Sequence, residues 1–202
     1  MNALLSDDGL LPGLPDPILD SQRVFRAVLD AMSHPGSIVE LTVGQTAPPS
    51  PLDVATAAVV LTMADYETAL WLDRDAATTA IAGYFRFHCG CPLAPQSGNA
   101  DFAIVTDPMT MPSLADFQLG SDEYPDRSTT LVIQIPALRG GEVWQLRGPG
   151  IPEVKTFAPF GLPGAFRNWR RDNQTLFPRG VDVIFTCGSS LAALPRSTRV
   201  ES

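Results

Sequence analysis

Apolar and polar positions along the chain predict helices and strands arranged around one central strand. The clearest apolar run is Val181–Cys187, which is rich in β-branched residues and is bounded by Gly180 and Gly188. A run of this length and kind predicts a strand buried on both faces, on which other elements pack. Asp182 is the exception within the run, because a carboxylate that enters a core needs a partner.

The first helix is predicted to be capped by Asp20 or Ser21 and to end before Pro35, since proline disfavours helix at the residue that precedes it. One face of this helix is expected to be buried, because its apolar residues recur at intervals of three and four positions. These residues are Val24, Phe25, Val28, Leu29 and Met32. Residues 1–19 are rich in proline and glycine and are predicted to form an extended lead-in over the surface or against a partner.

The other elements follow from apolar runs, small residues and turn residues. Further helices are expected over 52–64, with Pro51 at the first helical position, over 76–87 and over 163–176, and strands over 38–43, 69–72, 102–105 and 130–135. Residues 139–142 (Arg-Gly-Gly-Glu) predict a hairpin turn that leads into a strand at 143–146. Because strands alternate with helices before hairpins follow, the pattern predicts one domain over 1–202, an α/β three-layer sandwich with a mixed β-sheet.

Composition narrows the class of protein. The chain of 202 residues is 45% hydrophobic, and no apolar run approaches the ~18 residues that a membrane span requires. The first residues lack the basic region of a secretory signal, and three cysteines fit no disulfide framework. We therefore expect a cytosolic protein with reduced thiols and without a membrane segment.

The net charge of −8 at pH 7 argues against nucleic-acid binding, but the charge is unevenly distributed. Residues 1–126 carry 4 arginines and 17 acidic residues, a net of −13, whereas residues 127–202 carry 10 basic and 5 acidic residues, a net of +5. Solvated faces are the commoner explanation of such an imbalance. The basic part nevertheless leaves room for a local anion site.

Two segments resemble cofactor or nucleotide sites without meeting their requirements. Residues 148–156 (Gly-Pro-Gly-Ile-Pro-Glu-Val-Lys-Thr) lack the glycine that a nucleotide P-loop places before its lysine, and Pro149 and Pro152 remove two backbone donors. We interpret the segment as a shaped turn. Lys155 is the single lysine and hence the one candidate for a Schiff base with pyridoxal phosphate, but its strand-like surroundings predict an exposed side chain. No cofactor is expected.

Histidine, cysteine and arginine residues suggest two further sites. His34, His88, Cys89 and Cys91 have the donor atoms of a zinc site, but Cys-x-Cys is tighter than the usual spacing, so we favour buried thiols and no metal. Arg86 and His88 at a helix end suggest an anion site or a proton-transfer group, or cations that satisfy helix carbonyls.

Carboxylates near arginines favour structural ion pairs over catalytic groups. Asp65 and Asp182 are the carboxylates that we consider, and their candidate partners are Arg26, Arg86, Arg179 and Arg196. The sequence has no serine nucleophile elbow, and two histidines give little support for a catalytic triad.

An ordered set of short segments, spread from about residue 16 to residue 200, carries a resemblance to one family. The segments are Phe25-Arg26, Ala31–Gly36, Leu61-Thr62, Asp65, Thr68, Trp71-Leu72, Arg86–His88, Gly140-Gly141, Leu146, Gly148–Ile151, Phe177-Pro178, Gly180, Asp182, Cys187-Gly188 and Pro195-Arg196. In this order they resemble the PhnH family of the bacterial carbon–phosphorus lyase system. Cys89, Cys91 and the lead-in lie outside the pattern.

The resemblance implies a cytosolic homodimer with a fold like that of pyridoxal phosphate-dependent transferases, but without the cofactor. It implies assembly with the G, I and J subunits, and, with the G, I and L subunits, support for the synthesis of α-D-ribose 1-methylphosphonate 5-triphosphate. In that reaction methylphosphonate displaces adenine from the ribose C1 of ATP, and the resemblance assigns the chemistry to the I subunit. The resemblance therefore supplies no catalytic residue for this chain.

Two hypotheses follow. In the first, the chain is a structural and interaction subunit of a phosphonate-processing transferase complex, with one anion-binding pocket near His34, Asp65, Arg86 and His88 for a phosphonate or an ATP-derived ligand. Arginine suits such a ligand because its guanidinium binds two oxygens at once. In the second, the chain is an independent hydrolase that uses His88 and Asp65, with or without a metal ion.

Overall fold

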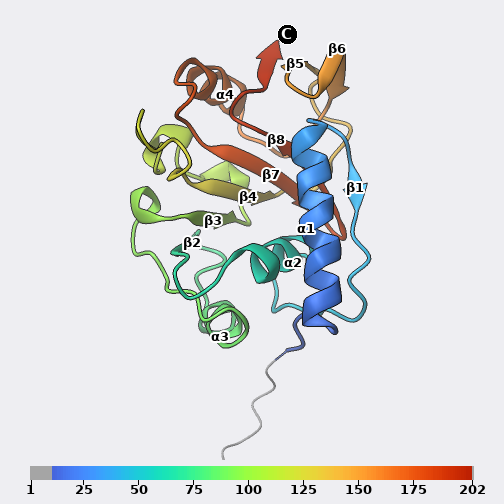
Figure 1. Ribbon diagram of the computed structural model, residues 1–202, viewed down its shortest axis with the longest axis vertical. Helices are drawn as coiled ribbons and strands as arrows, with labels where there is room; N and C mark the ends of the chain where they lie inside the picture. Colours follow the sequence, from blue (N-terminus) through green and yellow to red (C-terminus); the bar gives the residue numbers. More distant parts are fainter. Residues whose placement is uncertain (1–10, 202) are drawn as a thin grey trace, which may run out of the picture.

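The computed structural model describes residues 11–201 and contains two β-sheets with helices packed around them (Figure 1). The larger sheet has six strands, in spatial order β1 (Val39–Glu40), β8 (Ser190–Leu194), β7 (Asp182–Cys187), β4 (Thr130–Gln134), β3 (Phe102–Val105) and β2 (Leu70–Leu72). Strands β2, β3, β4 and β7 are parallel, whereas β8 is antiparallel to β7 and β1 is antiparallel to β8. The predicted α/β class with a mixed sheet is confirmed.

The predicted central strand, β7, lies between β4 and β8 in the middle of the larger sheet. Its residues are buried on both faces, and Val183, Ile184 and Phe185 are at most 1% exposed. Because neighbouring side chains of a strand point to opposite faces, Ile184 joins the core under the helices, whereas Val183 and Phe185 join the core on the other side.

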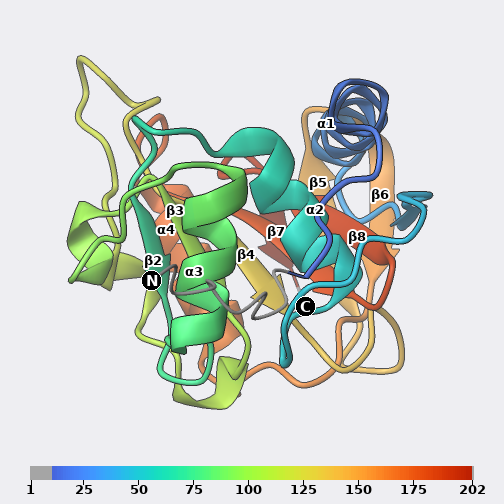
Figure 2. The ribbon, with the colours of Figure 1, turned by 90° about the horizontal axis from the view of Figure 1, so that it is seen from below.

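Helices α1 (Pro17–Ser33), α2 (Val54–Met63) and α3 (Thr79–His88) share the first of these cores. The small residues of α2, among them Ala55, Ala57 and Ala58, are fully buried and allow it to pack closely on the sheet and on α1, beside which it lies (Figure 2). Each predicted helix exists, and 3₁₀ turns at Ser97–Asn99, Pro108–Thr110 and Leu114–Asp116 were not predicted.

The other face of the larger sheet is covered by α4 (Phe166–Thr175) and by a three-stranded antiparallel sheet. This smaller sheet has the order β6 (Ile151–Phe157), β5 (Trp144–Gly148) and β9 (Arg199–Glu201). Aromatic rings fill the space between these elements, and Trp144 stacks on Phe166 with 6.2 Å between ring centroids. The smaller sheet was not predicted from the sequence.

The hairpin predicted at residues 139–146 is wrong. Strand β4 is paired on both sides within the larger sheet, by β3 and β7, so it cannot also pair with β5. Residues 139–142 instead form the link between the two sheets, and β5 pairs with β6 and β9. The strand predicted over 38–43 is reduced to the two residues of β1.

Two predictions about helix boundaries and one about a helix face are also wrong. Helix α1 is capped by Asp16, whose side chain accepts hydrogen bonds from the backbone of Ile18 and Leu19, so it begins within the predicted lead-in. Helix α2 begins at Val54, after Asp53, and Pro51 lies outside it. On α1, the buried face contains Val24, Val28 and Ala31. Phe25 and Leu29, which were predicted on that face, are 44% and 50% exposed. Residues 1–10 of the lead-in lie outside the described residues.

Residues 11–15 run across α3 before α1 begins. The hydroxyl of Tyr84 donates a hydrogen bond to the carbonyl of Pro12, at 3.2 Å, and the backbone N–H of Ala47 donates to the same oxygen at 3.1 Å. Burial raises the pKa of Tyr84 to about 12, so the hydroxyl stays protonated as the donor at neutral pH. None of the helices within residues 11–201 combines the length and the apolar character that a bilayer span would need.

Candidate functional site

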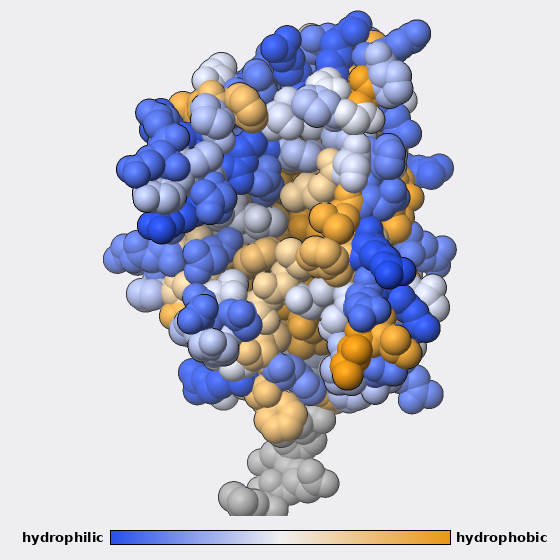
Figure 3. Space-filling view, in the orientation of Figure 1, coloured by the Kyte–Doolittle hydropathy of each residue, from blue (hydrophilic) through white to orange (hydrophobic). Residues whose placement is uncertain are grey.

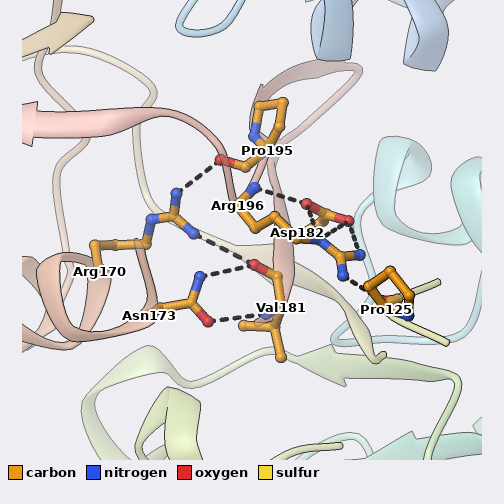
Figure 4. Close-up of polar contacts among 7 residues, drawn as sticks. All are labelled: Pro125, Arg170, Asn173, Val181, Asp182, Pro195 and Arg196. Atoms are coloured by element: carbon orange, nitrogen blue, oxygen red, sulfur yellow. Dashed lines mark hydrogen bonds and ion pairs between the residues drawn. The ribbon is translucent and has the colours of Figure 1, made fainter. Parts of the chain in front are cut away.

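Asp182, the carboxylate at the start of β7, is bound by Arg196. One carboxylate oxygen accepts from the backbone N–H of Arg196 at 2.7 Å, and the guanidinium reaches both oxygens at 2.5–3.2 Å. The two side chains are 16% and 15% exposed, and Arg196 also donates to the carbonyl of Pro125 (Figure 4). Because both carboxylate oxygens already accept hydrogen bonds, the pair fixes the segment after β8 to β7.

Arg170, which sequence reasoning did not single out, is the largest fully buried side chain of the described residues. Its guanidinium donates to the carbonyls of Pro195 at 2.9 Å and of Val181 at 3.4 Å (Figure 4). It also donates to the carbonyl of Thr198 at 3.4 Å. Burial lowers the pKa of Arg170 to about 10, so it is still a cation at neutral pH. The helical spacing of residues 163–176 is a signal that could have predicted Arg170 on the buried side of the helix. Arginine is seldom fully buried, however, so this residue type argues against such a prediction.

Asn173, one turn further along α4, completes this network. Its amide oxygen accepts from the backbone N–H of Val181 at 2.8 Å, and its amide nitrogen donates to the carbonyl of the same residue at 3.1 Å. Helix α4 thus holds the residue that precedes β7 by both backbone groups (Figure 4). The cluster of Arg170, Asn173, Asp182 and Arg196 has its polar groups directed at the chain itself, which is typical of a structural network.

The structure does not bring the four predicted pocket residues together. His34 ends α1 and contacts the side chain of Asp30 through Nδ1 at 3.0 Å, whereas Nε2 of His88 contacts the carbonyl of Leu11, which lies before the other end of α1. A helix of 17 residues separates these places by about 25 Å, since the rise is about 1.5 Å per residue. A single anion cannot contact both histidines.

Asp65 and Arg86 are exposed and lie on separate segments. Asp65 follows α2 and caps its own turn, because it accepts from the hydroxyl of Thr68 at 2.8 Å and from the backbone N–H of Glu67 at 2.9 Å. These hydrogen bonds, that of Thr68 first, lower the pKa of Asp65. The ion pair of Asp65 with an arginine is therefore not formed, and the carboxylate and His88 share no contact that a hydrolase would use. Arg179, another predicted partner, pairs with Asp122 at 3.1 Å.

All three cysteines are free thiols. The thiols of Cys89 and Cys91 are hydrogen-bonded to each other, which shifts their pKa values in opposite directions. The pKa of Cys89 is raised, with a further contribution from burial, and the pKa of Cys91 is lowered. Cys91 is 2% exposed and belongs to the core. Over residues 11–201 the His, Cys, Asp and Glu side chains form no group of three or more that could hold a metal ion.

The segment that resembles a P-loop is the turn of the β5–β6 hairpin. Gly148 pairs with Ile151, and Gly150 has a φ angle of +80°, which side-chain-bearing residues rarely adopt. A strand, and not a helix, follows the turn, so its N–H groups do not converge on a phosphate as in a P-loop. Lys155 lies on β6 and is exposed, as its strand-like surroundings predicted.

Polar residues also gather at the carboxyl ends of the parallel strands, where α/β proteins often bind ligands. Asp73, after β2, is 4% exposed and accepts from the backbone N–H groups of Thr106 at 2.6 Å and of Asp107 at 2.8 Å. Nearby, Oε1 of Gln134 accepts from Asp53 and Thr56. These hydrogen bonds join the strand ends to each other and to α2, so this edge serves the fold.

Comparisons with known proteins agree with one another. The family model described as "Bacterial phosphonate metabolism protein (PhnH)" matches residues 12–201. The chain is similar to "Alpha-D-ribose 1-methylphosphonate 5-triphosphate synthase subunit PhnH" of Rhizobium meliloti (strain 1021), with 38% identity over 186 residues that cover 92% of each chain. It is also similar to "Putative C-P lyase subunit protein HtxG" of Stutzerimonas stutzeri, with 27% identity over 179 residues, 89% of this chain and 85% of the relative.

Proposed function

The chain belongs to the PhnH family of bacterial phosphonate metabolism proteins, and from this we propose that it is a subunit of a carbon–phosphorus lyase complex. In that role it supports the synthesis of α-D-ribose 1-methylphosphonate 5-triphosphate from ATP and methylphosphonate, and its contribution is mainly structural. The main support for this proposal is the family match over residues 12–201, together with a relative of 38% identity that is named as a synthase subunit. The separation of His34 from His88 and the exposure of Asp65 support an interaction role over a reaction centre built from these groups.

A row of apolar side chains on the outer side of α1 supports the interaction role. Ile18, Phe25 and Leu29 are 72%, 44% and 50% exposed, and their spacing of seven and four residues places them on one side of the helix. Apolar side chains are seen over α1 in Figure 3. Since exposed apolar residues on one side of a helix often mark interfaces, we assign this row to a neighbouring subunit of the complex, as the subunit names of both relatives suggest.

The replacement of Ile18, Phe25 and Leu29 by glutamine is expected to prevent stable co-purification of the chain with its neighbouring subunits. The stability of the isolated chain should change little, because the three side chains are exposed and glutamine is a good helix former. Co-expression with the other complex subunits, followed by affinity purification, measures the effect. A matched control replaces Tyr66 and Phe87, which are 73% and 63% exposed elsewhere, by glutamine and should co-purify normally.

Two outcomes would contradict the assignment of the row. Normal co-purification of the triple variant would show that the row is not the subunit interface. Conversion of a dimer of the isolated chain to a monomer, with complex assembly intact, would assign the row to a second copy of the chain instead.

We further propose that the isolated chain forms a homodimer in the cytoplasm, with the G, I, J and L subunits as its partners in the complex. The free state of the three thiols supports a reducing compartment. The mixed sheet is compatible with kinship to the fold of pyridoxal phosphate-dependent transferases, and the exposure of Lys155 supports a chain that works without that cofactor. Sedimentation equilibrium of the purified chain tests the dimer, and a monomer at micromolar concentration would contradict it.

A further inference from the structure

A cavity lies between the segment before β1, the link from β4 to β5 and the end of β6. It has a volume of about 560 Å³, which is within the range of ~300–1,000 Å³ that is typical of small-molecule sites. Three segments supply its lining, namely residues 36–38 before β1, the residues Leu138, Arg139 and Val143 between β4 and β5, and residues 155–158 at the end of β6. The cavity is distinct from the pocket that the sequence suggested, because none of His34, Asp65, Arg86 and His88 lines it.

The charge of the cavity is positive, in contrast to that of the chain. Arg139 and Lys155 line it, and no lining residue is acidic, although the chain has 22 acidic and 14 basic residues. The ion pairs found within residues 11–201 involve neither cation. Two cations without a carboxylate partner at one hollow produce a local positive potential that attracts anions.

The rest of the lining is mixed in polarity. Ser37 and Thr156 supply hydroxyl groups, whereas Ile38, Leu138 and Phe157 provide an apolar surface. Leu138 and Phe157 are anchored in the core, with 6% and 4% exposure, so this part of the cavity is preformed. A ligand with an anionic end and a less polar body would satisfy both parts of the lining.

We propose that this cavity binds an organic polyphosphate, with Arg139 and Lys155 on the phosphate groups and the apolar surface against the organic body. The guanidinium of Arg139 can bind two phosphate oxygens at once, and the ammonium of Lys155 adds a compact charge. The proposal deepens the proposed function, on which it rests, because it gives the subunit a site for the phosphorylated substrate or product of the complex.

Lys155 makes a direct test possible, because it is the single lysine of the chain. The purified full-length chain is treated with an amine-acylating reagent, and the rate of modification of the peptide that contains Lys155 is measured by mass spectrometry. ATP without magnesium is the first probe, and adenosine and inorganic triphosphate separate the contributions of the organic body and of the phosphates. ATP is expected to slow the acylation at least fivefold, inorganic triphosphate less, and adenosine not at all.

Salt and variant controls distinguish a site from general charge screening. Sodium chloride at equal ionic strength measures the screening alone. Arg139→Gln should abolish the protection, whereas Arg74→Gln, the same change at an exposed arginine that does not line the cavity, should retain it. Equal acylation rates with ATP and with salt, or equal protection in both variants, would overturn the proposal. Loss of protection in Arg139→Gln together with normal co-purification would show that the ligand site and complex assembly are separate properties.

Discussion

Replacement of Arg170 by alanine is expected to destabilise the protein by about 4 kcal/mol. The guanidinium is fully buried and donates to the carbonyls of Val181, Pro195 and Thr198. Its removal takes one donor from each of these carbonyls and leaves a cavity where α4 meets β7. The carbonyl of Val181 still accepts from Asn173 and that of Pro195 from the backbone N–H of Thr198, whereas the carbonyl of Thr198 loses its donor. Thermal unfolding of the purified chain should show a decrease in Tm of about 10 °C, since 1 kcal/mol corresponds to about 2–4 °C at this size.

Two further variants show which interaction is responsible. Arg74→Ala removes an exposed arginine and should change the free energy of unfolding by no more than about 0.5 kcal/mol. Arg170→Met retains most of the volume but none of the donors, so it should remain strongly destabilised. A methionine variant as stable as the natural chain would show that packing, and not hydrogen bonding to the three carbonyls, is what Arg170 supplies.

Gly150→Ala is expected to cost about 3–5 kcal/mol, because two effects add at this position. The φ angle of Gly150 is +80°, and a Cβ atom there would lie 1.9 Å from the carbonyl oxygen of Ser33. The turn of the β5–β6 hairpin is thus pressed against the last turn of α1, and the backbone of one of them has to move. Urea unfolding of the variant measures the loss.

Gly140→Ala is the matched control for this substitution. Gly140 also has a positive φ, of +90°, but a Cβ atom built on it meets no atom within 4 Å. Its replacement should therefore cost only the backbone strain, about 1–2 kcal/mol. Equal losses in the two variants would show that the hairpin turn and α1 do not constrain one another.

The elements that the sequence predicted best are those in which local pattern and burial agree. Val181–Cys187 is apolar at nearly every position because β7 is covered on both faces, and the alanines of residues 52–64 are small because α2 is packed tightly. The smaller sheet could not be predicted in the same way, since β5 and β9 pair across more than 50 residues of sequence and β9 has only three residues. Local turn chemistry at Gly140-Gly141 indicated a hairpin, but strand pairing within the larger sheet decided against it.

The candidate sites show a similar division. The need of Asp182 for a partner followed from its place in an apolar run, but four arginines were candidates, and only the packing of the segment after β8 selects Arg196. For α1, a regular spacing of apolar residues predicted one buried face, whereas the helix has apolar residues on two sides and buries only one. The cavity with Arg139 and Lys155 was not predictable, because its walls come from three segments that are distant in sequence.

The place of β7 and β8 in the chain affects how the protein is made. Strand β1 has its partner 152 residues later, in the pair Val39–Leu191, and β7 and β8 are translated after all four α-helices. While the ribosome synthesises residues 40–180, the inner faces of α1 and α2 have no finished sheet to cover. Such a delay favours slow folding and exposes apolar surface to aggregation, so the nascent chain is expected to depend on chaperones until its final strands emerge.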